Sequence, residues 1–174
     1  MVLPALLISP TGSVSKELLP GRDRLVNVRT LVGGSVNGAN YRRGTRMWTL
    51  GDAGAHGPNI LATALASVWR GRDLAAAYWL RGPVLLTGAD AEDLPVALQQ
   101  QVYDDVHTLQ VVLDQVLRPR VGSGPRSDWE AWQQILVGAF AAVPAAAARP
   151  ERAPSSNGRP RSKDARPGRA EAAT

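Results

Sequence analysis

The residues of this chain that could do chemistry are few and scattered. The sequence contains no cysteine, which excludes disulfides, thiolate metal sites and cysteine nucleophiles. His56 and His107 are its only histidines, and neither belongs to a recognisable nucleophile motif or to a set of side chains large enough to hold a metal ion. We therefore expect a protein that is not an enzyme and that has no metal and no cofactor.

A glycine-rich segment, residues 51–59, is the strongest candidate for a small-ligand site. It places three glycines ahead of a predicted helix, and backbone amides in such a loop can turn toward a phosphate. The segment has no lysine and lacks the spacing of the nucleoside-triphosphate and dinucleotide motifs, so a tight turn with a helix cap is the alternative. A ligand or nucleotide bound here would contact Gly51, Asp52, Gly54, His56, Gly57 and Asn59.

A basic and aromatic cluster gives a second candidate, for nucleic acid. Arg42, Arg43 and Arg46 lie beside Tyr41 and Trp48, and arginine contacts phosphates while aromatic rings stack on exposed bases. A solvated loop between strands is the alternative interpretation. The C-terminal residues would add generic affinity for a polyanion through Arg159, Arg161, Lys163 and Arg166.

The charge distribution argues against a dedicated DNA-binding domain. The 174 residues carry a formal net charge of +5, but residues 149–174 hold seven basic and three acidic residues, which leaves +1 for residues 1–148. Residues 149–174 also contain no valine, isoleucine, leucine, methionine or aromatic residue, so they cannot bury enough apolar surface to fold. We expect a nearly neutral folded body with a disordered basic tail.

Hydrophobic periodicity and turn residues predict the elements that must position these candidates. Alternating or continuous apolar runs predict strands over 2–9, 14–19, 35–41, 46–50 and 82–87, the last covered on both faces and central in the sheet. Spacings of three and four predict helices over 21–32, 60–70, 94–117 and 128–143, and Gly33-Gly34 ends the first. The predicted fold is α+β, with a small mixed sheet in ββα-ββα-β order and two long C-terminal helices. We expect a domain over 1–90, a helical extension packed on it over 91–148, and the tail over 149–174.

The two C-terminal helices provide a third candidate surface. The aromatic residues Trp129, Trp132 and Phe140 share one stripe of the last helix, at a spacing typical of core packing. Packing within the chain is the default expectation. The alternative is that part of this surface binds a protein partner or a second copy of the chain.

Neither end of the chain predicts export or membrane insertion. The apolar run at the start lacks a basic segment before it, and the longest weakly apolar run, 135–148, is too short to cross a bilayer and is interrupted by Pro144. We expect a cytoplasmic protein that makes no membrane contact.

Several short motifs in the first half of the chain form a recognisable set. They are the opening Val2–Gly12 hairpin, Leu31-Val32-Gly33-Gly34, Gly51-Asp52-x-Gly54, Pro58-Asn59-Ile60-Leu61-Ala62-Thr63-Ala64 and Gly82-Pro83-Val84-Leu85-Leu86-Thr87-Gly88. Over about residues 2–90 the chain thereby resembles the bacterial and phage family called domain of unknown function 3846. The resemblance implies a protein of a phage, plasmid or other mobile element, and it implies no activity, cofactor or catalytic residue.

These observations favour a non-enzymatic accessory protein of a mobile element that binds a host or element protein through its C-terminal helices. The alternatives are a nucleic-acid-binding accessory protein that uses the arginine cluster and tail, and a small-ligand domain built on residues 51–59.

Overall fold

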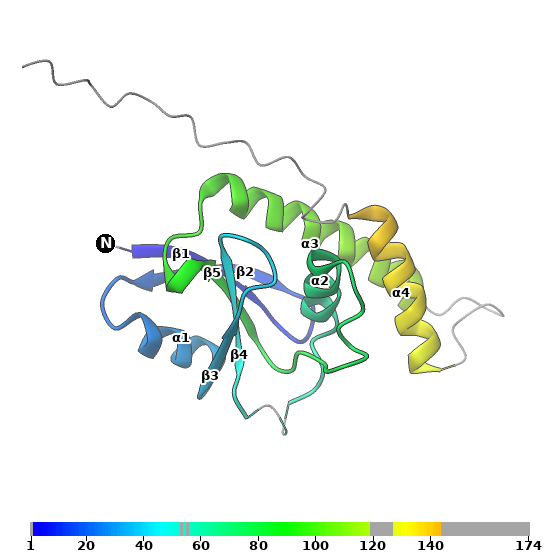
Figure 1. Cartoon of the computed structure of the whole chain (residues 1–174), viewed down its shortest axis with the longest axis horizontal. Coiled ribbons are helices and arrows are strands. Elements are labelled where there is room, and N and C mark those ends of the chain that lie inside the picture. The colour runs from blue at the N-terminus through cyan, green and yellow to red at the C-terminus, as the bar shows by residue number, and fades with distance from the viewer. Residues whose placement is uncertain (1, 53, 55, 119–126, 144–174) are drawn as a thin grey trace, which may run out of the picture.

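The chain folds around a five-stranded sheet with helices on both faces, which confirms the α+β class. The computed structural model describes residues 2–52, 54, 56–118 and 127–143. Figure 1 shows the sheet between helix α1 on one side and helix α3 on the other. The elements are β1 (Val2–Ile8), β2 (Val14–Pro20), α1 (Arg24–Val32), β3 (Val36–Ala39), β4 (Thr45–Leu50), α2 (Ile60–Arg70), β5 (Val84–Gly88), a 3₁₀ turn η1 (Ala89–Ala91), α3 (Val96–Leu117) and α4 (Asp128–Ala142).

The strand order is β2-β1-β5-β4-β3, and each neighbouring pair is antiparallel. The expected mixed sheet is therefore corrected to an antiparallel one. The central place of β5 is confirmed, since Leu85 pairs with Leu7 of β1 on one side and with Trp48 of β4 on the other. All five residues of β5 are buried because helices cover both faces, so an unbroken apolar run does not require parallel neighbours here.

One face of the sheet is covered by α1. Val28 and Val32 of this helix pack on Leu3 and Leu19 of the hairpin and on Leu85 of the central strand. The helix ends as predicted at Gly33, which adopts φ 97° and donates its amide hydrogen to the carbonyl of Arg29. This short helix closes the smaller of the two cores.

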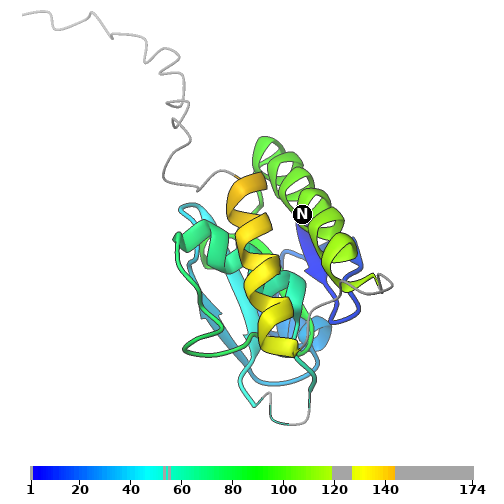
Figure 2. The same ribbon diagram turned by 90° about the vertical axis from the view of Figure 1, so that its right-hand side faces the viewer.

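The opposite face carries α2, α3 and α4. Residues Leu61–Trp69 of α2 are all buried, which is typical of a helix enclosed on every side. Figure 2 shows α4 running along the outside of this layer, beside α3. Val102 and Leu109 of α3 and Trp132 of α4 share one core with Leu6 of β1, so the C-terminal helices complete the main core.

Helix α4 begins at the capping motif that the sequence indicates. The hydroxyl of Ser127 accepts a hydrogen bond from the amide of Glu130, with 3.1 Å between oxygen and nitrogen. Residues 144–148 and the tail over 149–174, which includes Arg159, Arg161, Lys163 and Arg166, lie outside the described residues. Of the helical extension expected over 91–148, the structure describes residues 91–118 and 127–143.

The contact between α3 and α4 gives a first test. Gly138 of α4 faces Val112 of α3 so closely that an added methyl group would lie 2.7 Å from Cγ1 of Val112. Alanine normally stabilises a helix relative to glycine, but here we expect Gly138→Ala to lower the free energy of unfolding by about 1–2 kcal/mol through overpacking. Urea denaturation measures it. A gain in stability would contradict this contact, and a smaller loss in a Val112→Ala background would support it.

Candidate functional site

The predicted ligand residue Asn59 is instead a structural residue. It is fully buried, and its amide nitrogen donates hydrogen bonds to the carbonyls of Ile8 (3.0 Å) and Gly82 (2.9 Å). Its amide oxygen accepts a hydrogen bond from the backbone nitrogen of Ala62 at 3.0 Å, which caps α2. Both donor hydrogens and the oxygen are thus engaged within the chain, so Asn59 joins three segments of the fold and does not face a ligand.

The other predicted ligand residues of the 51–59 segment lie in an exposed loop. Gly51, Asp52, Gly54, His56 and Gly57 are exposed, and none of these three glycines has a positive φ. The amide of Gly51 donates to the carbonyl of Ser35, while the carbonyls of His56 and Gly57 accept from Arg81 and Gly82. The contact between Arg81 and His56 attaches the loop to the segment that precedes β5. A ligand role for these five residues remains a prediction.

Two buried hydroxyls that the sequence analysis did not single out extend the network of Asn59. Thr63 donates to the carbonyl of Asn59 at 2.8 Å and accepts from the amide of Leu80 at 3.2 Å. Ser67 donates to the carbonyl of Thr63 and accepts from the amide of Leu74. The segment between α2 and β5 is therefore fastened to one side of α2. Small hydroxyl residues at a spacing of four in an apolar helix were the available sequence signal.

Arg42 is not exposed for nucleic-acid contact, which corrects the expectation for this residue. Its side chain is 13% exposed and lies 3.7 Å from the carboxylate of the buried Asp105. The guanidinium also donates to the side-chain oxygen of Gln101 and lies over the ring of Trp69. The indole nitrogen of Trp69 donates to the same carboxylate at 3.1 Å. This cluster ties the β3–β4 hairpin to α3 and α2.

The rest of the basic and aromatic cluster is divided between surface and interior. Arg43 is exposed, whereas Arg46 is partly buried and lies 4.8 Å from the centre of the Trp48 ring. The rings of Tyr41 and Trp48 are 7% and 6% exposed and so are not available to stack on bases. Burial, and then the hydrogen bond to the Tyr78 hydroxyl, raise the pKa of Tyr41 far above its ordinary value.

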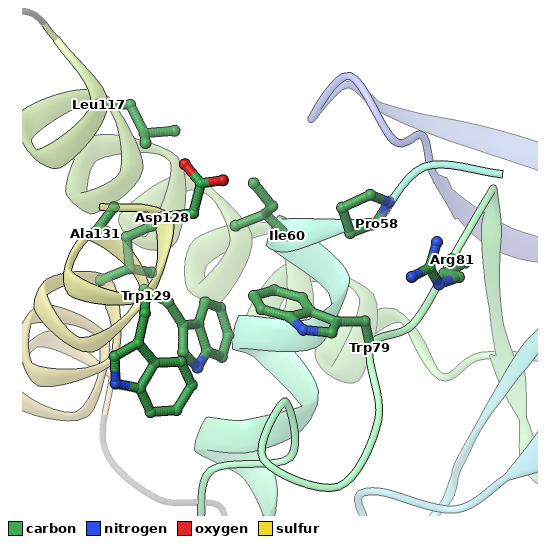
Figure 3. A pocket seen from close by; sticks show the side chains of 10 residues that line it. Pro58, Ile60, Trp79, Arg81, Leu117, Asp128, Trp129 and Ala131 are labelled. Carbon is green, nitrogen blue, oxygen red and sulfur yellow. The ribbon is translucent and has the colours of Figure 1, made fainter. Parts of the chain in front are cut away.

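A groove of about 420 Å³ lies between α4 and the segments before α2 and β5. Figure 3 shows its labelled side chains converging from these elements. The rings of Trp79 and Trp132 meet edge to face with their centres 4.5 Å apart, and the indole of Trp132 donates to the carboxylate of Asp73. The lining residues are Pro58, Ile60, Trp79, Arg81, Leu117, Asp128, Trp129, Ala131, Trp132 and Ile135.

Of the three predicted interface residues, Trp129 and Phe140 are exposed and Trp132 is buried. Trp129 is 56% exposed at the groove and Phe140 is 39% exposed farther along α4. Trp132 is 1% exposed and belongs to the main core, where it forms part of the groove wall and not of the outer surface. Trp79 and Arg81 were not predicted from the sequence, because only the fold brings their segment beside α4.

Among the described residues there is neither a cluster of metal ligands nor a helix suited to span a membrane. In the described ranges no three His, Asp or Glu residues lie close enough to hold a metal ion. None of the described helices combines the length and apolar character that crossing a membrane requires. Comparison with protein-family models, with curated proteins and with solved structures found no match.

The role of Asn59 predicts a large effect of one atom exchange. Asn59→Asp keeps an oxygen that can cap α2 but removes both hydrogens donated to the carbonyls of Ile8 and Gly82. We expect the free energy of unfolding to fall by about 3 kcal/mol, measured by urea denaturation. Asn37→Asp makes the same exchange at an exposed position of β3 and should change it by less than about 0.5 kcal/mol. Equal stability of the two variants would contradict the structural role of Asn59 and support a ligand role for it.

The Arg42 cluster predicts a contrast between two neighbouring arginines. Arg42→Ala removes the guanidinium that lies 3.7 Å from the buried carboxylate of Asp105, and we expect a loss of about 3 kcal/mol of unfolding free energy. Arg43→Ala, at the exposed neighbour, should cost less than about 1 kcal/mol. Thermal and urea denaturation test both. If Arg42→Ala is as stable as Arg43→Ala, the ion pair does not hold the hairpin. Partial recovery of the free energy of unfolding in Arg42→Ala/Asp105→Asn would support a stabilising role for the ion pair.

Proposed function

We propose that this chain is a non-enzymatic accessory protein of a mobile genetic element that binds a host or element protein in the cytoplasm. The observation that carries the proposal is the aromatic groove, in which an exposed tryptophan of α4 stands beside the Trp79–Trp132 pair. Tryptophan and arginine are the residues most enriched at the energetic centres of protein interfaces, and the groove presents both.

The groove is held ready for binding by buried contacts. Its wall at Trp79 belongs to the segment that Thr63 and Ser67 fasten to α2, and its wall at Trp132 is held by Asp73. A surface already in its binding conformation loses little conformational entropy when a partner docks. A preformed apolar groove with few polar groups favours recognition of a partner.

The mobile-element context rests on the family resemblance of residues 2–90. The non-enzymatic character is supported by the side chains of the groove, where one arginine and one aspartate flank apolar residues without a nucleophile beside a base. The competing nucleic-acid function depends on Arg43, Arg46 and the tail, since Arg42 is held by Asp105. The competing small-ligand function depends on the exposed residues of the 51–59 loop. Both enter the experiment below as outcomes.

Removal of the exposed indole tests this proposal. The full chain, tagged and immobilised, is incubated with lysate of a bacterial host, with and without nuclease treatment, and bound proteins are identified and quantified. We expect Trp129→Ala to reduce capture of a stoichiometric protein by about tenfold or more, because truncation of an interface tryptophan commonly costs 2 kcal/mol or more. Leu25→Ala is the matched control, since Leu25 is 50% exposed on α1 at the opposite face of the sheet.

Three results would contradict the proposal. Equal capture by Trp129→Ala and Leu25→Ala would remove the groove from the interaction. Capture that disappears on nuclease treatment, with affinity that falls steeply as salt rises, would favour the nucleic-acid function. A nucleotide-induced rise in melting temperature that Asp52→Ala or His56→Ala removes would favour the small-ligand function.

A further inference from the structure

The two ends of the aromatic groove carry opposite charges. Arg81 lines one end and Asp128 the other, and in Figure 3 they stand on opposite sides of Ile60 and Trp79. We propose that the groove binds a short peptide segment of the partner in a single orientation. An aromatic or leucine side chain of the peptide contacts Trp79 and Trp129, an acidic group meets Arg81, and a basic group meets Asp128. This inference rests on the proposed function and specifies its partner.

Arg81 is held in place without being neutralised. Its guanidinium donates one hydrogen bond to the carbonyl of His56 at 3.0 Å, and its backbone bridges to Pro58. Backbone hydrogen bonds from Asn59 to Leu80 and from Gly82 to Gly57 lie on either side of that bridge. Within the described part of the chain Arg81 is exposed and forms no ion pair. A fixed and unneutralised guanidinium beside an apolar groove favours a carboxylate ligand.

Asp128 supplies the opposite charge at the first residue of α4. The positive end of the helix dipole interacts favourably with a carboxylate at this position. Among the described residues it too is exposed and has no ion-pair partner. The two charges of the groove therefore cancel in sum but stand at opposite ends. A peptide with separated acidic and basic groups can match them in one orientation.

The shape of the surface favours an extended peptide over a compact ligand. A second hollow of about 460 Å³ adjoins the groove and shares Ile60 and Leu117 with it, continuing toward Gly12 of the β1–β2 turn. Two hollows that share lining residues suit successive side chains of one extended segment. A nucleic acid is disfavoured, because the carboxylate of Asp128 would repel phosphates at one end of an apolar groove.

The proposal is tested with a randomised heptapeptide library displayed on phage and selected on the immobilised full chain. Phage that also bind Trp129→Ala are removed by counter-selection. We expect the enriched sequences to share an aromatic residue or leucine, with an acidic residue on one side of it and lysine or arginine on the other. Synthesis of the most enriched peptide then allows the affinity to be measured directly by fluorescence anisotropy.

Charge reversal identifies the two ends. Arg81→Glu should lower the affinity for the enriched peptide by about tenfold or more. Arg22→Glu makes the same change at an exposed position before α1 and should alter this affinity by less than about twofold. A peptide whose acidic residue is replaced by lysine should regain affinity for Arg81→Glu. In NMR spectra the indole signals of Trp79 and Trp129 should shift on peptide binding, while those of the buried Trp48 and Trp69 should not.

Four outcomes would overturn the inference. They are a selection without enrichment over Trp129→Ala, an equal effect of Arg81→Glu and Arg22→Glu, indole shifts at Trp48 and Trp69 alone, and a concentration-dependent dimer that Trp129→Ala abolishes, which would make a second copy the occupant. If any of these occurs while lysate capture still depends on Trp129, the proposed function stands and only the peptide chemistry is wrong. If capture also loses that dependence, both are wrong.

Discussion

The hydrogen bonds of the Asn59 side chain are the constraint on which the rest of the structure depends. Through them the end of β1, the start of α2 and the start of β5 meet at one buried point. Loss of a hydrogen bond between buried polar groups costs about 1–3 kcal/mol, so the three contacts of this side chain are a large part of the stability of the fold. Helix α2 is buried on all sides: this point holds its start against the sheet, and its other sides pack against α3 and α4.

The groove follows from the same constraint. The segment between α2 and β5 contains no regular element over Arg72–Pro83, and yet Trp79 and Arg81 are held in place because hydroxyls of α2 accept its amides and the bridge at Pro58 continues the contact. Helix α4 then supplies the second wall through the Trp79–Trp132 contact. An interaction surface at this position is built from a loop, but it has the rigidity of the helix beneath it.

A second buried cluster keeps the charge of two arginines away from the exposed surface. Arg42 directs its charge inward to Asp105, and Arg46 lies over the ring of Trp48, which is itself buried. An arginine can bury its stem and its flat guanidinium against an aromatic ring, so it serves as a packing residue as well as a charge. The number of arginines in the 41–48 segment therefore overstates the positive charge that this segment exposes.

The sequence by itself determined the features that depend on neighbouring residues: the hairpin at 2–20, the stop at Gly33, the cap at Ser127, the covered strand β5 and the bounds of α3 and α4 to within a few positions. Only the tertiary structure decided the direction of the strands, the burial of Asn59 and Arg42, and the groove. The partners of Asn59 include a carbonyl 51 residues away, and periodicity and turn chemistry act over a few residues. A side chain suited to capping or to phosphate contact is equally suited to a buried network, and only long-range packing selects between the two.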